Sequence, residues 1–239
     1  MQAISSLAMK VDSTNIESRL VVAQAVAGTL FLVFLVLHLS NTFLAVFGPE
    51  AYNGYQRAVR QIYQYPLLEL LLVIGPLITH VIAGLWLYRI RKSRRLTRAL
   101  RYRLQSWAGF FLLLVVFGHV LATRGISYWY GVFAEFEGVS FSLWWVPAYF
   151  YPYYFLLFMA GLYHGSMGVL SVMKRFGFMR VRARSNYFPA LVAGLGAVGA
   201  ILILLAFGGF LFEIDDPRDN DYARQYGELM NIELTGPRQ

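Results

Sequence analysis

The sequence predicts an all-α integral membrane protein in which five transmembrane helices form a bundle. Hydrophobic residues make up 58% of the 239 residues and charged residues only 14%, against about 25% charged residues in a typical soluble domain. Five segments are each long and apolar enough to cross the bilayer core, which takes about 20 residues of helix. Cysteine is absent. This composition excludes a disordered chain, a disulfide scaffold and an ordinary cytosolic enzyme.

Each helix is predicted from a stretch with almost no charge. The first stretch carries none between Arg19 and Glu50, and the second, residues 66–88, carries only Glu69. The third, fourth and fifth stretches carry none. We therefore expect helices at about 20–47, 66–90, 104–123, 146–173 and 187–212. The whole chain, residues 1–239, then forms a single membrane domain that ends in an acidic tail, residues 213–239, and no convincing internal repeat is evident.

The charges between the helices predict the orientation. Five spans place the N-terminal tail and the loops 89–103 and 174–184 on one side, and these hold 15 of the 21 Lys and Arg residues. The other side holds 6 of them, together with ten of the thirteen acidic residues. Because basic loops stay in the cytoplasm, we expect a cytoplasmic N-terminus and an acidic tail outside. The net charge of +8 therefore needs no nucleic acid to explain it.

The four histidines of the chain fall one in each of the first four predicted helices: His38, His80, His119 and His164. Ionisable side chains at membrane depth are costly and usually functional. At 1.5 Å of rise per residue, His38 and His119 lie about 24 and 18 Å from the inner edge, and His80 and His164 about 12 and 13 Å. We call the first two the outer pair and the last two the inner pair.

Two histidines at one depth on two helices can hold a metal ion or the two axial positions of a haem, and a haem held this way needs no cysteine. Four histidines at two depths cannot share one zinc ion, so two stacked b haems are the favoured interpretation; a zinc site, a proton relay and structural packing are the alternatives. Gly84 and Gly168 follow the inner histidines by four residues and leave room for a flat ring. Thr42 and Thr123 follow the outer ones by four residues and offer hydroxyls to a propionate or an imidazole nitrogen.

Short motifs surround these histidines and occur in a characteristic order. They are Leu37-His38-Leu39, Glu50-Ala51-Tyr52-Asn53, Leu68-Glu69, Gly75-Pro76-Leu77-Ile78-Thr79-His80, Gly118-His119-Val120 and His164-Gly165-Ser166. From about Val21 to Phe212, the chain resembles the di-haem cytochrome b membrane anchor of succinate:quinone oxidoreductases, the succinate dehydrogenases and fumarate reductases, of the bacterial single-anchor type.

The resemblance implies a function for a complex rather than for this chain alone. A flavoprotein subunit with FAD and an iron–sulfur subunit would sit on the cytoplasmic face of the bacterial cytoplasmic membrane and exchange electrons with succinate or fumarate. This chain, surrounded by lipid, would pass them through the inner and then the outer haem to a quinone, expected to be menaquinone. It would have no succinate site of its own. A di-haem anchor of another membrane oxidoreductase, and a haem-free five-helix transporter or scaffold, are the alternatives.

Further residues are candidates for supporting roles. Glu69, near the outer end of helix two, is a candidate for proton transfer to the quinone, or else an interfacial carboxylate. Arg124 is expected to pair with a haem propionate or with Glu69, or to reach the membrane surface.

Some fumarate reductases of this type carry a glutamate two residues before the helix-four ligand and use it for proton transfer. Leu162 occupies that position in this chain, which argues against that proton route. The aromatic segment 126–154 is interpreted as an interfacial loop, or as part of a quinone or lipid pocket. Weaker candidates for inner propionate contacts are Arg19, Arg89 and Arg91.

Overall fold

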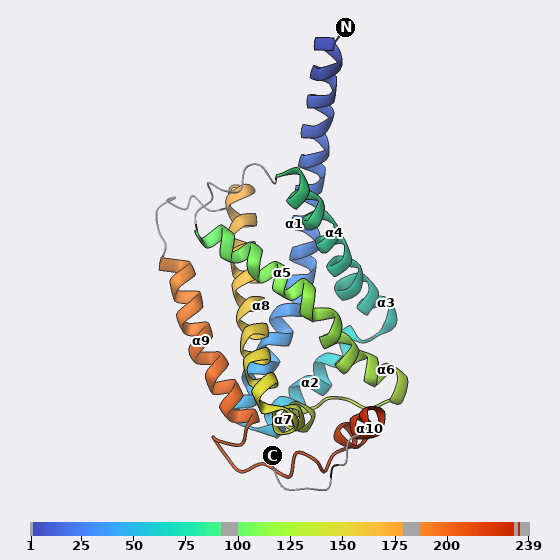
Figure 1. Ribbon diagram of the computed structural model, residues 1–239, viewed down its shortest axis with the longest axis vertical. Coiled ribbons are helices and arrows are strands. Elements are labelled where there is room, and N and C mark those ends of the chain that lie inside the picture. Colours follow the sequence, from blue (N-terminus) through green and yellow to red (C-terminus); the bar gives the residue numbers. More distant parts are fainter. Residues whose placement is uncertain (1, 92–99, 179–186, 232–233, 235–239) are drawn as a thin grey trace.

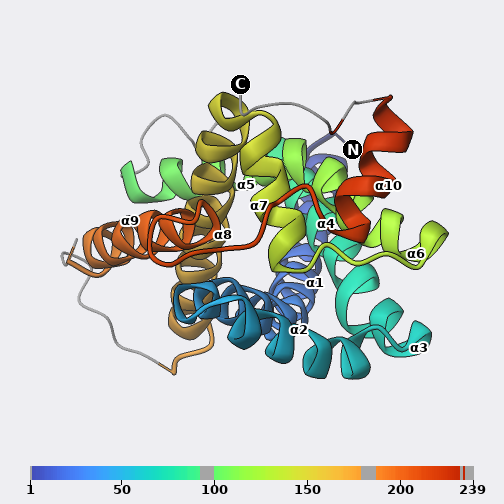
Figure 2. The ribbon, with the colours of Figure 1, turned by 90° about the horizontal axis from the view of Figure 1, so that it is seen from below.

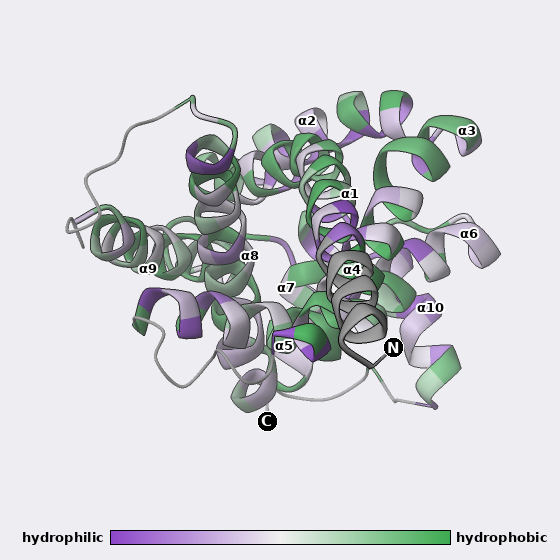
Figure 3. Ribbon diagram, turned by 90° about the horizontal axis from the view of Figure 1, so that it is seen from above, coloured by the Kyte–Doolittle hydropathy of each residue, from purple (hydrophilic) through white to green (hydrophobic). Residues whose placement is uncertain are grey.

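The computed structural model describes residues 2–91, 100–178, 187–231 and 234, with side chains from residue 15 onward. Within these ranges helices are the only regular secondary structure. Five of the described helical segments are long and apolar enough to cross a membrane: Asn15–Phe47, Pro66–Ile90, Leu100–Tyr130, Pro147–Arg175 and Tyr187–Phe207. The chain is therefore an all-α multi-pass membrane protein, as predicted, and the hydropathy colouring shows apolar residues along its spans (Figure 3).

The first span belongs to a helix much longer than predicted. Helix α1 runs over Gln2–Leu44 and is followed by a 3-10 turn, η1, at Ala45–Phe47. The polar stretch before the predicted start near residue 20 continues the helix, and the apolar span within the helix begins at Asn15. The first turns of α1 project beyond the other helices (Figure 1).

The second span has the predicted bounds but contains a π-helical segment. It consists of α3 at Pro66–Glu69, η2 at Leu70–Ile74 and α4 at Gly75–Ile90. The π turn has a local cause. Pro76 has no N–H to donate, so the regular helical ladder is interrupted there, and the N–H of Gly75 instead donates to the carbonyl of Leu70. A β-carbon at residue 75 would lie 2.8 Å from that carbonyl oxygen, so glycine permits the turn.

The third and fifth spans differ from prediction at their ends, and the fourth agrees within two residues. The third consists of α5 at Leu100–Val120, a second π segment, η4, at Leu121–Gly125, and α6 at Ile126–Tyr130. It extends past the predicted end at residue 123, because the first residues of the aromatic segment continue the helix. Helix α8 covers Pro147–Arg175. Helix α9 ends at Phe207 rather than 212, since Gly209 adopts a positive φ of 73° that a helix cannot continue through.

Four of the spanning helices surround the interior, and the fifth lies outside them. Helix α1 packs against α4, and α5 packs against α8. Helix α9 packs against α8 and η1, at the periphery of the bundle (Figure 2). The four helices around the interior are thus the four that carry histidine.

Three shorter helices close the end of the bundle opposite the N-terminus (Figures 1 and 2). They are α2 at Pro49–Tyr63, α7 at Phe136–Trp145 and α10 at Asp221–Met230. The region predicted as an acidic tail therefore contains a helix folded against the bundle. Its Tyr222 hydroxyl donates to the carbonyl of Ala122 over 2.8 Å, and Ala223 is fully buried.

Polar contacts hold α2 onto the start of α7. The Asn53 side chain accepts from the N–H of Phe136 at 2.8 Å and donates to the Glu137 carboxylate at 3.2 Å. Arg57 donates two hydrogen bonds to Glu135, of 3.0 and 2.6 Å, and so holds the pKa of that carboxyl below its usual value. These contacts fix a polar helix across the end of an apolar bundle.

Candidate functional site

The structure brings the four histidines together in two pairs, the same two that their depths predict. The ring centroids of His38 and His119 are 5.9 Å apart, and those of His80 and His164 are also 5.9 Å apart. Within the described residues, no group of three or more His, Cys, Asp or Glu side chains gathers. Each depth therefore offers two imidazoles.

The spacing within each pair suits two imidazoles on opposite sides of one metal atom. A metal–imidazole nitrogen bond is about 2.0 Å long. Two such bonds, together with the distance from the nitrogen to the ring centre on each side, separate the ring centres of two opposed imidazoles by about 6 Å. Both pairs stand at 5.9 Å. Each pair therefore has the spacing that two imidazoles would need to hold one metal atom between them.

The inner pair is also oriented as metal ligands are. Nδ1 of His80 lies 3.0 Å from the carbonyl oxygen of Gln24, and Nδ1 of His164 lies 3.0 Å from that of Gln105. A carbonyl only accepts, so in each bond Nδ1 carries the hydrogen and Nε2 keeps its lone pair. Metal-binding histidines typically donate their other ring N–H to a carbonyl or carboxylate in this way.

The outer pair has a different environment. The ring of Phe34 stacks on His38 with centroids 5.6 Å apart. The hydroxyl of Thr42 donates to the carbonyl of His38 at 2.9 Å, and that of Thr123 donates to the carbonyl of His119 at 2.8 Å. The hydroxyls are thus bonded to the helix backbone rather than to an imidazole nitrogen, which was one of the two partners expected for them.

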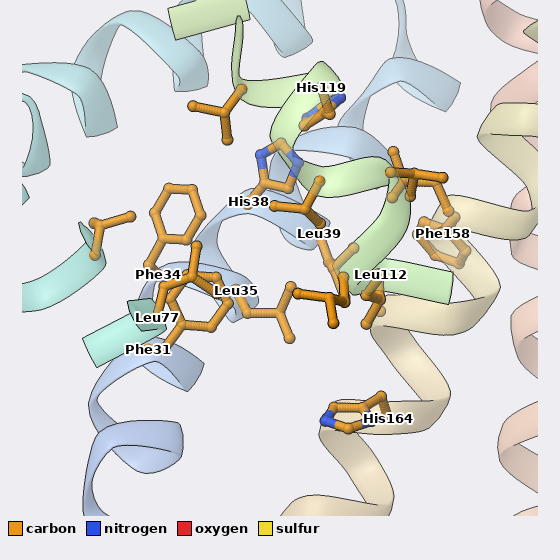
Figure 4. Close-up of a pocket in the computed structure, with 18 of the residues that line it drawn as sticks. Phe31, Phe34, Leu35, His38, Leu39, Leu77, Leu112, His119, Phe158 and His164 are labelled. Carbon is orange, nitrogen blue, oxygen red and sulfur yellow. The ribbon is translucent and has the colours of Figure 1, made fainter. Parts of the chain in front are cut away.

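One cavity of about 2130 Å³ runs through the bundle and is lined by both pairs. Ordinary small-molecule pockets measure about 300–1,000 Å³, and protein interiors leave few voids larger than a water molecule. Apolar side chains, among them Leu35, Leu39 and Leu112, lie between the outer pair and His164 (Figure 4). The cavity is thus large, mostly apolar and elongated across two depths, which suits two flat hydrophobic groups.

An ion pair lies beside the outer part of the cavity. Arg124 donates to both carboxylate oxygens of Glu69, over 2.6 and 2.7 Å, and to the hydroxyl of Ser127 over 3.2 Å. The side chains of Glu69 and Arg124 are only 12% and 28% exposed, and both line the cavity. Of the partners expected for Arg124, the structure shows Glu69.

The three weaker candidates for inner propionate contacts lie in different environments. Arg19 and Arg89 are exposed. Arg91 lines the cavity and pairs with Glu17 at 2.7 Å. Of the three, Arg91 alone lines the cavity.

Sequence reasoning missed the polar wall formed by α2. Its cavity-lining residues follow a helical spacing: Tyr52, Gln56, Arg60, Tyr63 and Gln64. The guanidinium of Arg60 stacks 3.8 Å above the ring of Phe133. A period of four through residues 52, 56 and 60 is the signal that marks this face. The aromatic segment is split: Tyr153 and Tyr154 line the cavity, whereas Tyr128 and Trp129 are largely exposed.

Comparison of the chain with known protein families, with curated proteins and with solved structures gives no match. The function is therefore inferred from the chemistry of the site, which combines two imidazole pairs, a large apolar cavity across two depths and a partly buried ion pair at one end.

Proposed function

We propose that this chain is a di-haem cytochrome b that anchors a succinate:quinone oxidoreductase in the bacterial cytoplasmic membrane. The observation that supports this most is the presence of two imidazole pairs, each 5.9 Å apart, within one cavity. The haems would be of b type, because a chain without cysteine has no thiol for covalent attachment. When bound, they supply one-electron chemistry at two depths of the membrane.

The residues of the chain prepare this site in three ways. His38 with His119, and His80 with His164, would hold the two haem irons. The carbonyl groups of Gln24 and Gln105 fix the inner imidazoles in the tautomer that exposes Nε2. The mostly apolar lining around the pairs favours retention of a hydrophobic group.

The partners follow from what this chain lacks. Without cysteine it cannot hold an iron–sulfur cluster through thiolates, so the clusters and FAD would belong to an iron–sulfur subunit and a flavoprotein subunit. The basic loops and the N-terminus mark the predicted cytoplasmic face on which they would dock. Residues 92–99 and 179–186 of these loops lie outside the described residues.

We place the quinone, expected to be menaquinone, at the outer part of the cavity. Glu69, Arg124 and the polar wall of α2 line it there and provide hydrogen-bond donors and acceptors for the two oxygens of a quinone ring. Glu69 is the proposed proton donor. Because Arg124 binds both of its oxygens, that transfer requires the ion pair to open or rearrange.

Purification of the affinity-tagged chain from its native membrane tests the assignment to a complex. We expect the chain to co-purify with a flavoprotein and an iron–sulfur protein. We also expect its haem absorption spectrum to change from the oxidised to the reduced form when succinate is added. A control preparation without succinate should stay oxidised. If the chain contains haem but co-purifies with another oxidoreductase, and its haem spectrum is unchanged by succinate, the succinate assignment is contradicted. The di-haem assignment would then still stand.

A further inference from the structure

Helix α1 and the third span, α5 with η4, carry the same four residue types at the same spacing, although the sequence alone suggested no repeat. The four are separated by four, ten and four residues in both helices. On α1 they are Gln24, Gly28, His38 and Thr42, and on the third span they are Gln105, Gly109 and His119 of α5 with Thr123 of η4. Each helix packs against a second helix that carries an inner-pair histidine, α1 against α4 and α5 against α8.

The hydrogen bonds made by these residues are repeated in the two sets, as well as the residue types. The threonine hydroxyl donates to the carbonyl of the histidine one turn before it in both helices, at 2.9 and 2.8 Å. The glutamine carbonyl accepts from the inner histidine of the neighbouring helix in both, at 3.0 Å. The α1–α4 and α5–α8 pairs are therefore two copies of one arrangement.

The glycines stand where an imidazole approaches the helix. A β-carbon on Gly28 would lie 2.7 Å from Nδ1 of His80. A β-carbon on Gly109 would lie 2.9 Å from Cε1 and 3.1 Å from Nδ1 of His164. Such contacts are too short, so a side chain at either position would push the ring away.

Helix geometry explains why glycine is needed four residues after the glutamine. A helical side chain covers the turn on the N-terminal side of its own α-carbon. A side chain at residue 28 would therefore lie over the carbonyl of residue 24, and one at residue 109 over that of residue 105. Glycine leaves these carbonyls open to a second donor besides the helical N–H.

We propose that Gly28 and Gly109 are positioning residues for the inner haem ligands. By leaving the carbonyls of Gln24 and Gln105 uncovered, they set the tautomer and the ring plane of His80 and His164 from two equivalent sides. This inference depends on the proposed di-haem function and adds to it that the inner site is built from backbone carbonyls on the two helices that carry the outer ligands.

Alanine substitution at these glycines, made one at a time in the full chain, tests the proposal. In Gly28→Ala and in Gly109→Ala we expect inner-haem affinity to fall about 10- to 100-fold, the range for loss of a group that orients a metal ligand. Any inner haem that is retained should show a shifted low-spin ferric EPR signal, while the outer haem keeps its content and signal. The His38→Ala and His80→Ala variants identify which signal belongs to which haem.

The matched control is Gly199→Ala. Gly199 is also a helical glycine, a β-carbon there meets nothing within 4 Å, and it does not line the cavity. Both haems and both EPR signals should be unchanged. Unchanged inner-haem content and signal in both test variants would overturn the positioning role, and so would loss of both haems from both test variants. Absence of haem from the wild-type chain would instead contradict the proposed function.

Discussion

Replacement of His38 by alanine is expected to lower the haem content from about two per chain to about one, and replacement of His119 is expected to remove the same haem. Replacement of His80 or His164 should remove the other one. The reason is that each pair stands at the spacing of two ligands on one metal, 5.9 Å between ring centres, so after loss of either member only one imidazole would remain to hold the haem. Reduced-minus-oxidised spectra and EPR of the four purified variants provide the measurement.

The pattern across the four variants is more informative than any one of them. Two variants that lose the outer haem and two that lose the inner one would establish both pairs. Loss of the same haem from His38→Ala and His80→Ala would contradict the pairing, because these residues lie in different pairs.

The second large effect is expected at the ion pair between Glu69 and Arg124. Glu69→Gln leaves the Arg124 guanidinium without its carboxylate in a site where both side chains are partly buried. Removal of one partner from a fully buried pair costs about 3–5 kcal/mol, so the loss at this partly buried pair should be smaller than that but larger than at an exposed pair. The temperature at which the purified chain loses its structure in detergent should therefore fall clearly. The double variant Glu69→Gln/Arg124→Gln should lose less than the sum of the two single variants.

A surface ion pair of the same chain provides the control. Arg57 pairs with Glu135, but the Arg57 side chain is 60% exposed, and exposed pairs contribute little. Arg57→Gln should therefore change the unfolding temperature much less than Glu69→Gln does. Equal effects of the two substitutions would contradict a special contribution from the buried pair.

The same Glu69→Gln variant examines the proposed proton transfer. If both haems are retained, quinone reduction in the complex should slow by about 100-fold or more, since a positioned proton donor contributes about that much. Unchanged turnover would assign Glu69 a structural role alone.

The sequence predicted the features that depend on composition and on position along a helix. Five spans follow from apolar length, and the two histidine pairs follow from depth, because rise per residue is fixed. Helix ends were less accurate: α1 begins far before residue 20, and α9 stops at Phe207. Polar residues can continue a helix outside the apolar core, and a glycine pair can stop one inside an apolar stretch.

The features that could not be predicted from the sequence depend on which faces of the helices pack against each other. Helix α2 is polar on average, and it is held in place by long-range contacts such as that between Asn53 and Glu137. The roles of Gly28 and Gly109 follow from which faces of α1 and α5 are turned toward His80 and His164. Depth along the helix does not determine this orientation. The choice of Glu69 as the partner of Arg124 likewise needed the packed structure.

The haem content of the wild-type chain is the decisive measurement for the di-haem proposal. The chain would be purified in detergent, and its haem counted by the pyridine haemochrome assay against protein concentration, with a reduced-minus-oxidised spectrum of the same sample. Two imidazole pairs within one cavity predict about two b haems per chain. A chain that purifies folded and carries no haem would contradict this account.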